Sequence, residues 1–231
     1  RFMAWPSYTN NVFERYRTDS RLLQIVKPLI GDTLKQVSNQ VIWKPPETQS
    51  TSYGFHQDAR FRRPASAFRN IGNSYIQTAI AIDEHRPENG CLKIVSGSHR
   101  AGYINRDFKE SVFDQDCTEE VLLEWGLGGH AIVNIDLEPG DVAIWHPFAV
   151  HGSGPNLSTE NRRSFLNGYV KADCSDRGEW AFRASKAVPL GDEPMLVQYE
   201  DLYTRPEPHY ITGPPNPFLS ASQPEGKIGE T

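Results

Sequence analysis

Short apolar runs, most of them closed by residues that favour turns, recur along most of the chain. Pro45-Pro46 ends the first run, the stretch 83–90 (DEHRPENG) ends the second, and Glu138-Pro139-Gly140-Asp141 separates two later ones. Many short strands separated by Gly/Pro turns predict an antiparallel β-barrel or sandwich. The segments expected to be strands are 40–43, 75–82, 92–95, 131–137, 142–146 and 163–170.

Other segments depart from this pattern. Apolar residues at helical spacing over 19–36 predict an amphipathic helix outside the barrel, with Pro28 marking a break or a start. The polar, Gly-containing stretch 101–130 has the character of a lid over a site. Residues from about 175 to 231 hold many prolines and predict a wrapping tail. We find no repeat and no boundary, so we expect one domain over 1–231.

Composition narrows the class of protein. The net charge of -5 lacks the basic footprint of a nucleic-acid binder. No apolar run approaches the roughly 20 residues of a membrane span. Three cysteines without CxxC spacing suit a reducing compartment, so we expect a cytoplasmic protein. The chain opens on Arg1 rather than Met, and we expect N-terminal sequence to be missing.

His56-Gln57-Asp58 is the first candidate for chemistry. In an extended segment, residues i and i+2 point to the same face, so His56 and Asp58 can ligate one ion. Two histidines and one carboxylate, with open positions left over, are typical of non-haem Fe(II) oxygenases. Taken alone, however, a surface histidine near a surface aspartate is the commoner explanation of H-x-D.

A second candidate lies almost a hundred residues later. A hydrophobic strand leads to His151 in a Gly-rich turn, and glycines let the backbone approach a site closely. Arg162, eleven residues on, has a planar fork that fits a carboxylate, and Ser153 offers a hydroxyl. His146 would face the opposite side of a continuous strand from His151. His99 is expected to hold its own loop.

The ordered set of motifs resembles the phytanoyl-CoA dioxygenase family of Fe(II)/2-oxoglutarate oxygenases. The order and spacing agree from about residue 40 to 173. The motifs are Lys44-Pro45-Pro46, His56-Gln57-Asp58, Glu88-Asn89-Gly90-Cys91-Leu92, Gly97-Ser98-His99, Gly140-Asp141, His146-Pro147, and His151-Gly152-Ser153-Gly154 with Asn156 and Arg162.

The resemblance implies roles for particular residues. His56, Asp58 and His151 match the family's iron ligands. Arg162 matches the arginine that pairs with the far carboxylate of 2-oxoglutarate, with Ser153 beside it. Gln40 falls where the family places a residue near that co-substrate.

The resemblance also implies a fold and a reaction. The fold is a double-stranded β-helix, a cupin-like jelly-roll with flanking α-helices. The reaction uses Fe(II), 2-oxoglutarate and O2, hydroxylates an aliphatic C–H of a small molecule, and releases succinate and CO2. Desaturation, epimerisation and ring formation use the same ligands, whereas halogenating relatives usually lack the carboxylate that Asp58 supplies. A cupin-like non-redox metal protein or isomerase, which has no need for Arg162, and an inactive scaffold are the other classes.

The substrate side of the site is less defined. Relatives often carry a tryptophan where this chain has Ala79, which leaves extra space near the co-substrate. Tyr53, Arg60 and Arg62 flank the metal motif and are substrate candidates. The two arginines would share the face of Asp58 if the segment stays extended, which suits an anionic substrate; surface arginines on a loop are an equal alternative. We expect a monomer or weak homo-oligomer.

Overall fold

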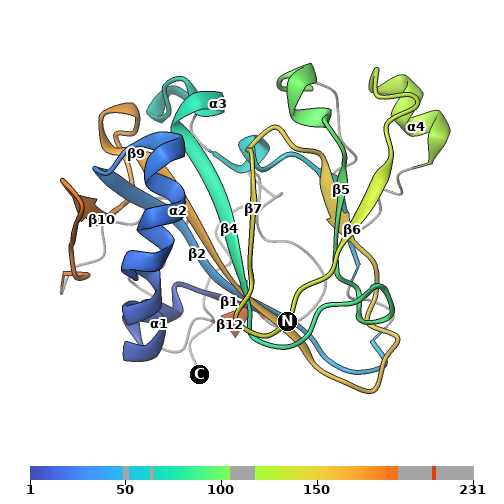
Figure 1. The fold of residues 1–231 in the computed structure, drawn as a ribbon, viewed down its shortest axis with the longest axis horizontal. Coiled ribbons are helices and arrows are strands. Elements are labelled where there is room, and N and C mark those ends of the chain that lie inside the picture. Colours follow the sequence, from blue (N-terminus) through green and yellow to red (C-terminus); the bar gives the residue numbers. More distant parts are fainter. Residues whose placement is uncertain (49–51, 63–64, 105–117, 192–209, 212–231) are drawn as a thin grey trace, which may run out of the picture.

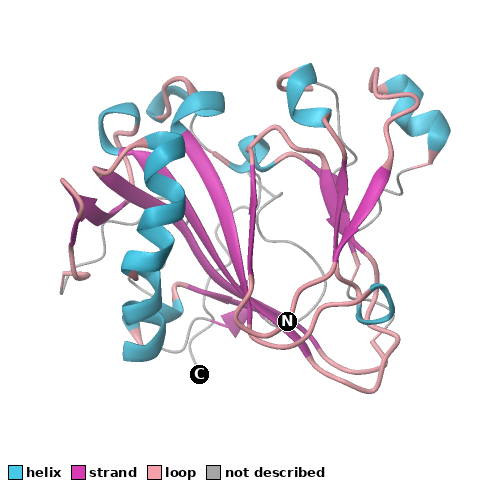
Figure 2. Ribbon diagram, in the orientation of Figure 1, coloured by secondary structure: helices cyan, strands magenta, loops and turns pink. Residues whose placement is uncertain are grey.

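Two antiparallel sheets face each other, and a helical layer covers the outer side of the larger one (Figures 1 and 2). The computed structural model describes residues 1–48, 52–62, 65–104, 118–191 and 210–211. The larger sheet has the order β11-β10-β2-β9-β4-β7, with β1 paired to β2 and β12; the smaller has the order β3-β8-β5-β6. The strands are β1 Phe2–Ala4, β2 Leu34–Lys44, β3 Tyr53–His56, β4 Tyr75–Ala81, β5 Leu92–Val95, β6 Ile132–Ile135, β7 Val142–Trp145, β8 His151–Ser153, β9 Arg162–Lys171, β10 Glu179–Arg183, β11 Lys186–Ala187 and β12 Tyr210–Ile211.

From β2 to β9 the chain passes repeatedly between the two sheets, as in a jelly-roll. This mainly β architecture confirms the fold class expected from the alternation of short strands and turns. All six segments expected to be strands are strands, and the first is much longer than expected because β2 pairs along its whole length with β9.

The helices are α1 Asn11–Arg17, α2 Ser20–Ile30, α3 Ile71–Ser74 and α4 Glu119–Glu124, with short 3₁₀ turns at Pro6–Tyr8, Asp58–Phe61, Ala65–Ala67, Pro87–Asn89, Ser98–Ala101 and Ala172–Cys174. Figure 1 shows α1 and α2 lying along the outer face of the larger sheet. There Leu23, Val26 and Ile30 of α2 pack against Ile76 and Tyr169.

The helix expected over 19–36 is too long at its C-terminal end. Asp19 caps α2, and the helix ends at Ile30, before Gly31 with its positive φ of 87°. Leu34 already belongs to β2, because pairing with β9 overrides the helical spacing of its apolar neighbours. Pro28 sits in the last turn of α2 and does not break it.

Two other segments differ from expectation. Residues 179–187 form β10 and β11 at the edge of the larger sheet, where no strand was expected. The lid expected over 101–130 lies in part outside the described residues (105–117). Its described part packs Leu122 and Leu127 with Val95 and Val150, on the face of the smaller sheet that is turned away from the larger one.

The space between the sheets is lined by side chains that alternate along each strand. Ala79 and Ala143 are paired across β4 and β7, and pack in one cluster with Trp145 and with Leu92 of the smaller sheet. The functional candidates lie in this interior. None of the described helices has the length and apolar character that a bilayer crossing requires.

Candidate metal centre

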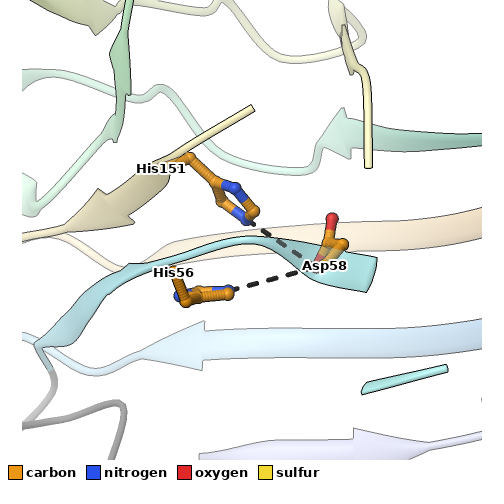
Figure 3. Close-up of side chains that lie close together, drawn as sticks. All are labelled: His56, Asp58 and His151. Atoms are coloured by element: carbon orange, nitrogen blue, oxygen red, sulfur yellow. Dashed lines mark ion pairs between the residues drawn. The ribbon is translucent and has the colours of Figure 1, made fainter. Parts of the chain in front are cut away.

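His56, Asp58 and His151 converge in the interior between the two sheets (Figure 3). His56 ends β3 and is paired with His151, the first residue of β8. Asp58 opens the 3₁₀ turn that follows β3. Its Oδ1 lies 4.0 Å from His56 Nε2 and 3.8 Å from His151 Nε2. One ligand atom from each residue therefore falls within 4.8 Å of the other two.

Backbone carbonyls fix the orientation of both imidazoles. His56 Nδ1 lies 2.7 Å from Gly54 O, and His151 Nδ1 lies 2.9 Å from Ala149 O. Each Nδ1 must carry the proton to donate to its carbonyl, which leaves each Nε2 lone pair directed at Asp58. Burial lowers the pKa of His56 to about 4, so this imidazole is neutral at neutral pH. Two imidazoles and one carboxylate fit a divalent transition metal.

Trp145 holds the carboxylate. Its Nε1 donates to Asp58 Oδ2 at 2.7 Å, so Oδ1 is the oxygen that remains turned toward the histidines. The indole also lies 5.2 Å from the ring of His151. The role of Trp145 could not be recognised from the sequence, because a tryptophan in an apolar strand has the same pattern as an ordinary core residue.

Gln57 anchors the turn between the two ligands of the H-x-D motif. It is fully buried; its Nε2 donates to Gly102 O at 2.9 Å and Phe148 O at 2.6 Å, and its Oε1 accepts from Ile104 N. The glutamine thus ties the metal motif to the loop before β8. A rigid support of this kind keeps ligands near the geometry that a metal needs.

A pocket of buried cations lies beside the three candidate ligands. Arg162 on β9 and Lys44 on β2 are cross-strand partners, exposed by 5% and 0%. Lys44 Nζ donates to Ser153 Oγ at 2.7 Å and to the carbonyl of Gly154. Within the described residues no carboxylate forms an ion pair with either cation, and Arg162 Nε is buried without a partner.

Two positive charges in one buried pocket disfavour each other. Burial lowers the pKa of Arg162 to about 10. Burial and the charge of Arg162 together hold the pKa of Lys44 well below its usual value. An anion in this pocket would relieve both effects. Lys44 belongs to the K-P-P motif, but a role in anion binding could not be recognised from the sequence because most lysines are exposed to solvent.

The cation pocket, formed by Arg162, Lys44 and Ser153, lies one same-face position along β8 from the candidate metal ligand His151. Ser153 follows His151 by two residues on β8, and same-face neighbours on a strand lie about 6.6 Å apart. This spacing suits a short dicarboxylic acid with one end at the metal and the other at Arg162. Ser153 was expected beside Arg162. Lys44 links the two residues, since it hydrogen-bonds to Ser153 and is the cross-strand partner of Arg162.

The remaining co-substrate candidates line the same interior. Gln40 lies two steps before Lys44 on β2 and shares a cross-strand row with Leu166 and Ala79. Ala79 is buried in the interior cluster with Ala143 and Trp145. Tyr53, expected near the substrate, pairs with Ser153, and Lys44 Nζ lies 5.5 Å from its ring centre. Tyr53 therefore lies beside Ser153 and Lys44, where burial raises its pKa to about 12.

The segment after Asp58 does not stay extended, so the condition under which Arg60 and Arg62 would share the face of Asp58 is not met. Asp58–Phe61 forms a 3₁₀ turn, which places Arg60 over the ring of Phe61, with 5.9 Å between Cζ and the ring centre. Arg62 is nevertheless buried, with only 5% of its surface exposed.

The competing residues lie elsewhere. His146 Nδ1 accepts from Phe148 N at 3.0 Å, and its ring lies 5.5 Å from that of His99, outside the group of possible metal ligands. Arg163 faces away from Arg162 and forms a two-point ion pair with Asp83, 2.7 Å long in each contact.

The amino-acid sequence is similar to those of several known proteins. The chain is 25% identical over 164 residues to bovine peroxisomal phytanoyl-CoA dioxygenase, covering 69% of this chain and 46% of that protein. It is 25% identical over 202 residues to a probable alpha-ketoglutarate-dependent hypophosphite dioxygenase of Stutzerimonas stutzeri, covering 78% and 64%. The chain thus spans about half to two thirds of the length of these relatives.

Solved structures confirm the fold. The non-heme monooxygenase ThoJ superposes with a TM-score of 0.65 at 19% identity, covering 87% of this chain and 75% of that one. EctD from S. alaskensis, solved with 2-oxoglutarate and 5-hydroxyectoine, gives a TM-score of 0.62 at 20% identity, covering 83% and 69%. These likenesses support the double-stranded β-helix expected from the motifs.

A family model settles the relationship. The model of the phytanoyl-CoA dioxygenase (PhyH) family matches residues 6–164, which is more than half of the 231-residue chain. The match includes the H-x-D motif and His151. The chain belongs to the phytanoyl-CoA dioxygenase family.

Proposed function

We propose that this protein is an Fe(II)- and 2-oxoglutarate-dependent dioxygenase that hydroxylates an aliphatic C–H of a small molecule. In this proposal His56, Asp58 and His151 hold the iron. Arg162, Ser153 and Lys44 bind the distal carboxylate of 2-oxoglutarate, and Gln40 lines its floor. When bound, iron and co-substrate supply the oxidation of a C–H bond by O2, with release of succinate and CO2.

The observation that carries the proposal is the pairing of two neighbouring sites. One offers two imidazoles and a carboxylate; the other offers two buried cations with no acidic partner in the described residues. A non-redox cupin needs only the first. Burying Arg162 and Lys44 together is costly unless an anion joins them. A dicarboxylic co-substrate that reaches from one site to the other accounts for both.

The protein's own residues supply orientation. Gly54 and Ala149 fix the two imidazoles, and Trp145 fixes the carboxylate of Asp58. Lys44 is held by Ser153 and Gly154, so it is already in place when the co-substrate arrives. Preorganised charges in a buried site act more strongly than the same charges in water. With Asp58 present, the ligand set favours oxygenation over halogenation.

The class of substrate and the cellular compartment can be proposed only in general terms. Two relatives are named for phosphorus oxyanions: the hypophosphite dioxygenase above and a methylphosphonate hydroxylase of Gimesia maris, which is 28% identical over 152 residues and covers 66% of this chain and 51% of that protein. They support a small, anionic substrate. The free cysteines among the described residues, Cys91 and Cys174, support a reducing compartment such as the cytoplasm.

Conversion of 2-oxoglutarate to succinate tests the proposal. The wild-type protein with Fe(II), 2-oxoglutarate and air should form succinate and consume O2, and His151→Ala should form none because a metal ligand is lost. Small aliphatic carboxylates and phosphonates are added in parallel, since a substrate speeds the reaction. If iron binds but 2-oxoglutarate stays intact under every condition, the non-redox cupin alternative is correct instead.

A further inference from the structure

A second buried guanidinium lies in the interior, apart from the co-substrate pocket. Arg62 Nη2 donates to the Tyr75 hydroxyl at 2.7 Å, and its Cζ lies 4.7 Å from the centre of the Tyr75 ring. Its Nε is buried and has no hydrogen-bond partner in the described part of the chain. No described carboxylate lies within ion-pair distance of Arg62.

A chain of side chains connects Arg62 with the candidate metal ligands. The Tyr75 hydroxyl donates to Gln77 Oε1, and Gln77 is the cross-strand partner of Trp145. Trp145 in turn donates to Asp58. The polar group formed by Arg62, Tyr75 and Gln77 therefore lies next to the metal centre.

Along β9 this group lies toward the opposite end of the strand from Arg162. On β9, Arg162 pairs with Lys44 at one end of the strand, whereas Gly168 pairs with Gln77 six residues further along. A Cβ at Gly168 would collide with the Tyr75 hydroxyl and lie 2.8 Å from Gln77 Oε1. The glycine thus leaves room for the Tyr75–Gln77 hydrogen bond at the far end of the interior.

Arg62 resembles Arg162 in its burial and in its lack of hydrogen-bond partners at Nε. Like Arg162, it is 5% exposed, has a buried Nε without a partner, and lacks an acidic partner among the described residues. A buried cation is stable only when other groups replace the water it has lost. Stacking on Tyr75 replaces part of that water. Asp58 does not form an ion pair with Arg62 and already accepts from Trp145.

We propose that Arg62 and Tyr75 bind an oxyanion of the primary substrate, a carboxylate or a phosphoryl group, toward the opposite end of β9 from the co-substrate pocket. This rests on the proposed function, because the co-substrate must occupy Arg162. The planar guanidinium presents Nε and an Nη to two oxygens of one such group. The carbon to be oxidised then lies between the anchored oxyanion and the metal.

Anion binding to the loaded protein tests the proposal. The protein is saturated anaerobically with Fe(II) and 2-oxoglutarate, which fills the Arg162 pocket and gives a visible charge-transfer band. Methylphosphonate and butyrate are then titrated separately by calorimetry. We expect one equivalent of at least one of them to bind, and Arg62→Met to weaken that binding at least tenfold while the band remains.

Matched variants separate this site from general charge effects. Arg69→Met removes an exposed arginine that pairs with Asp176, and binding should be unchanged. Arg62→Lys keeps the charge without the fork and should give intermediate affinity, which shows that the loss in Arg62→Met is not a loss of folding. Tighter binding of methylphosphonate or of butyrate identifies the phosphoryl or carboxylate class.

Two results would overturn the inference. One is a normal band with no binding of either anion to the wild type. The other is equal binding to the wild type and Arg62→Met, which would mean that the anion binds the metal or the surface. Absence of the band itself would instead count against the proposed function, so the two failures are distinguishable.

Discussion

At the scale of single residues, the geometry of the candidate metal site depends on the neighbouring groups that orient each candidate ligand. Asp58 has two oxygens, and the bond from Trp145 to Oδ2 leaves Oδ1 facing His56 and His151. The imidazoles have their own carbonyl partners. Residues that orient ligands typically change metal affinity 10–100-fold when they are replaced.

Trp145→Phe keeps an aromatic ring in the interior but removes the donor to Asp58. We expect Fe(II) or Co(II) to bind roughly ten times more weakly or worse, measured by anaerobic titration. Trp43→Phe is the control, because it loses a comparable bond from Nε1 to Asn161, 2.9 Å long, on the outer face of the larger sheet. Equal metal affinity in wild type and Trp145→Phe would show that Asp58 needs no such support.

The three candidate metal ligands were predictable from the sequence, whereas the residues that surround and orient them were not. The i, i+2 spacing of His56 and Asp58 follows from strand geometry, and His151 was assigned from its Gly-rich turn and from the family resemblance. Trp145 and Lys44 belong to sequence patterns that also fit a core residue and a solvated surface residue. Only the register of β2 with β9 and of β4 with β7 shows that both point into the interior.

At the scale of elements, the turn at Pro87–Asn89 is packed against the end of β8. Gly90 has a φ of 75°, and a Cβ there would collide with the Gly154 carbonyl and lie 2.6 Å from that of Pro155. The Gly154 carbonyl also accepts from Lys44. The E-N-G turn, which by sequence needs no chemistry, therefore supports the cation pocket from outside.

Gly90→Ala should destabilise the protein and weaken 2-oxoglutarate binding. A non-glycine residue at positive φ costs about 1–2 kcal/mol, and the collision adds about 1–3 kcal/mol. Gly126→Ala is the matched control, since Gly126 has a φ of 72° and open space around the Cβ position. Urea unfolding should show only the first cost in Gly126→Ala. Equal stability of the two variants would mean that the contact with Gly154 and Pro155 is not tight.

Six strand positions were predictable because turn residues lie beside their apolar runs, whereas β10 and β11 were not predicted. The end of α2 was not, because Leu34 continues the helical spacing while its backbone pairs with β9. The turn after Asp58 was not predictable either, since nothing in Ala59, Arg60 or Phe61 requires a 3₁₀ conformation. Arg62 is buried only because of that turn.

At the scale of the whole molecule, the helical layer must stay attached to the larger sheet. Arg17 at the end of α1 is fully buried; it forms an ion pair with Glu14 and donates to the carbonyls of Trp180, at 3.0 Å, and Val188, at 2.8 Å. One side chain thus joins α1 to β10 and to the segment after β11. The β10–β11 hairpin, where a wrapping tail without strands was expected, is therefore an integral part of the larger sheet.

Arg17→Met should lower the free energy of unfolding by about 3 kcal/mol or more, because it leaves Glu14 and two carbonyls without their donor. Arg21→Met removes a solvated arginine paired with Asp19 and should leave stability almost unchanged. Urea unfolding measures both variants. A small effect of Arg17→Met would show that the apolar contacts of α2 alone hold the helical layer.

The central claim is that one chain binds iron and 2-oxoglutarate side by side. Its most direct test is the visible charge-transfer band that Fe(II) and 2-oxoglutarate form together without oxygen. We predict the band in the wild type, 2-oxoglutarate affinity at least about 30-fold weaker in Arg162→Met, and no change in Arg163→Met, whose arginine pairs with Asp83 on the other face. No band in the iron-loaded wild type, or unchanged affinity in Arg162→Met, would contradict this account.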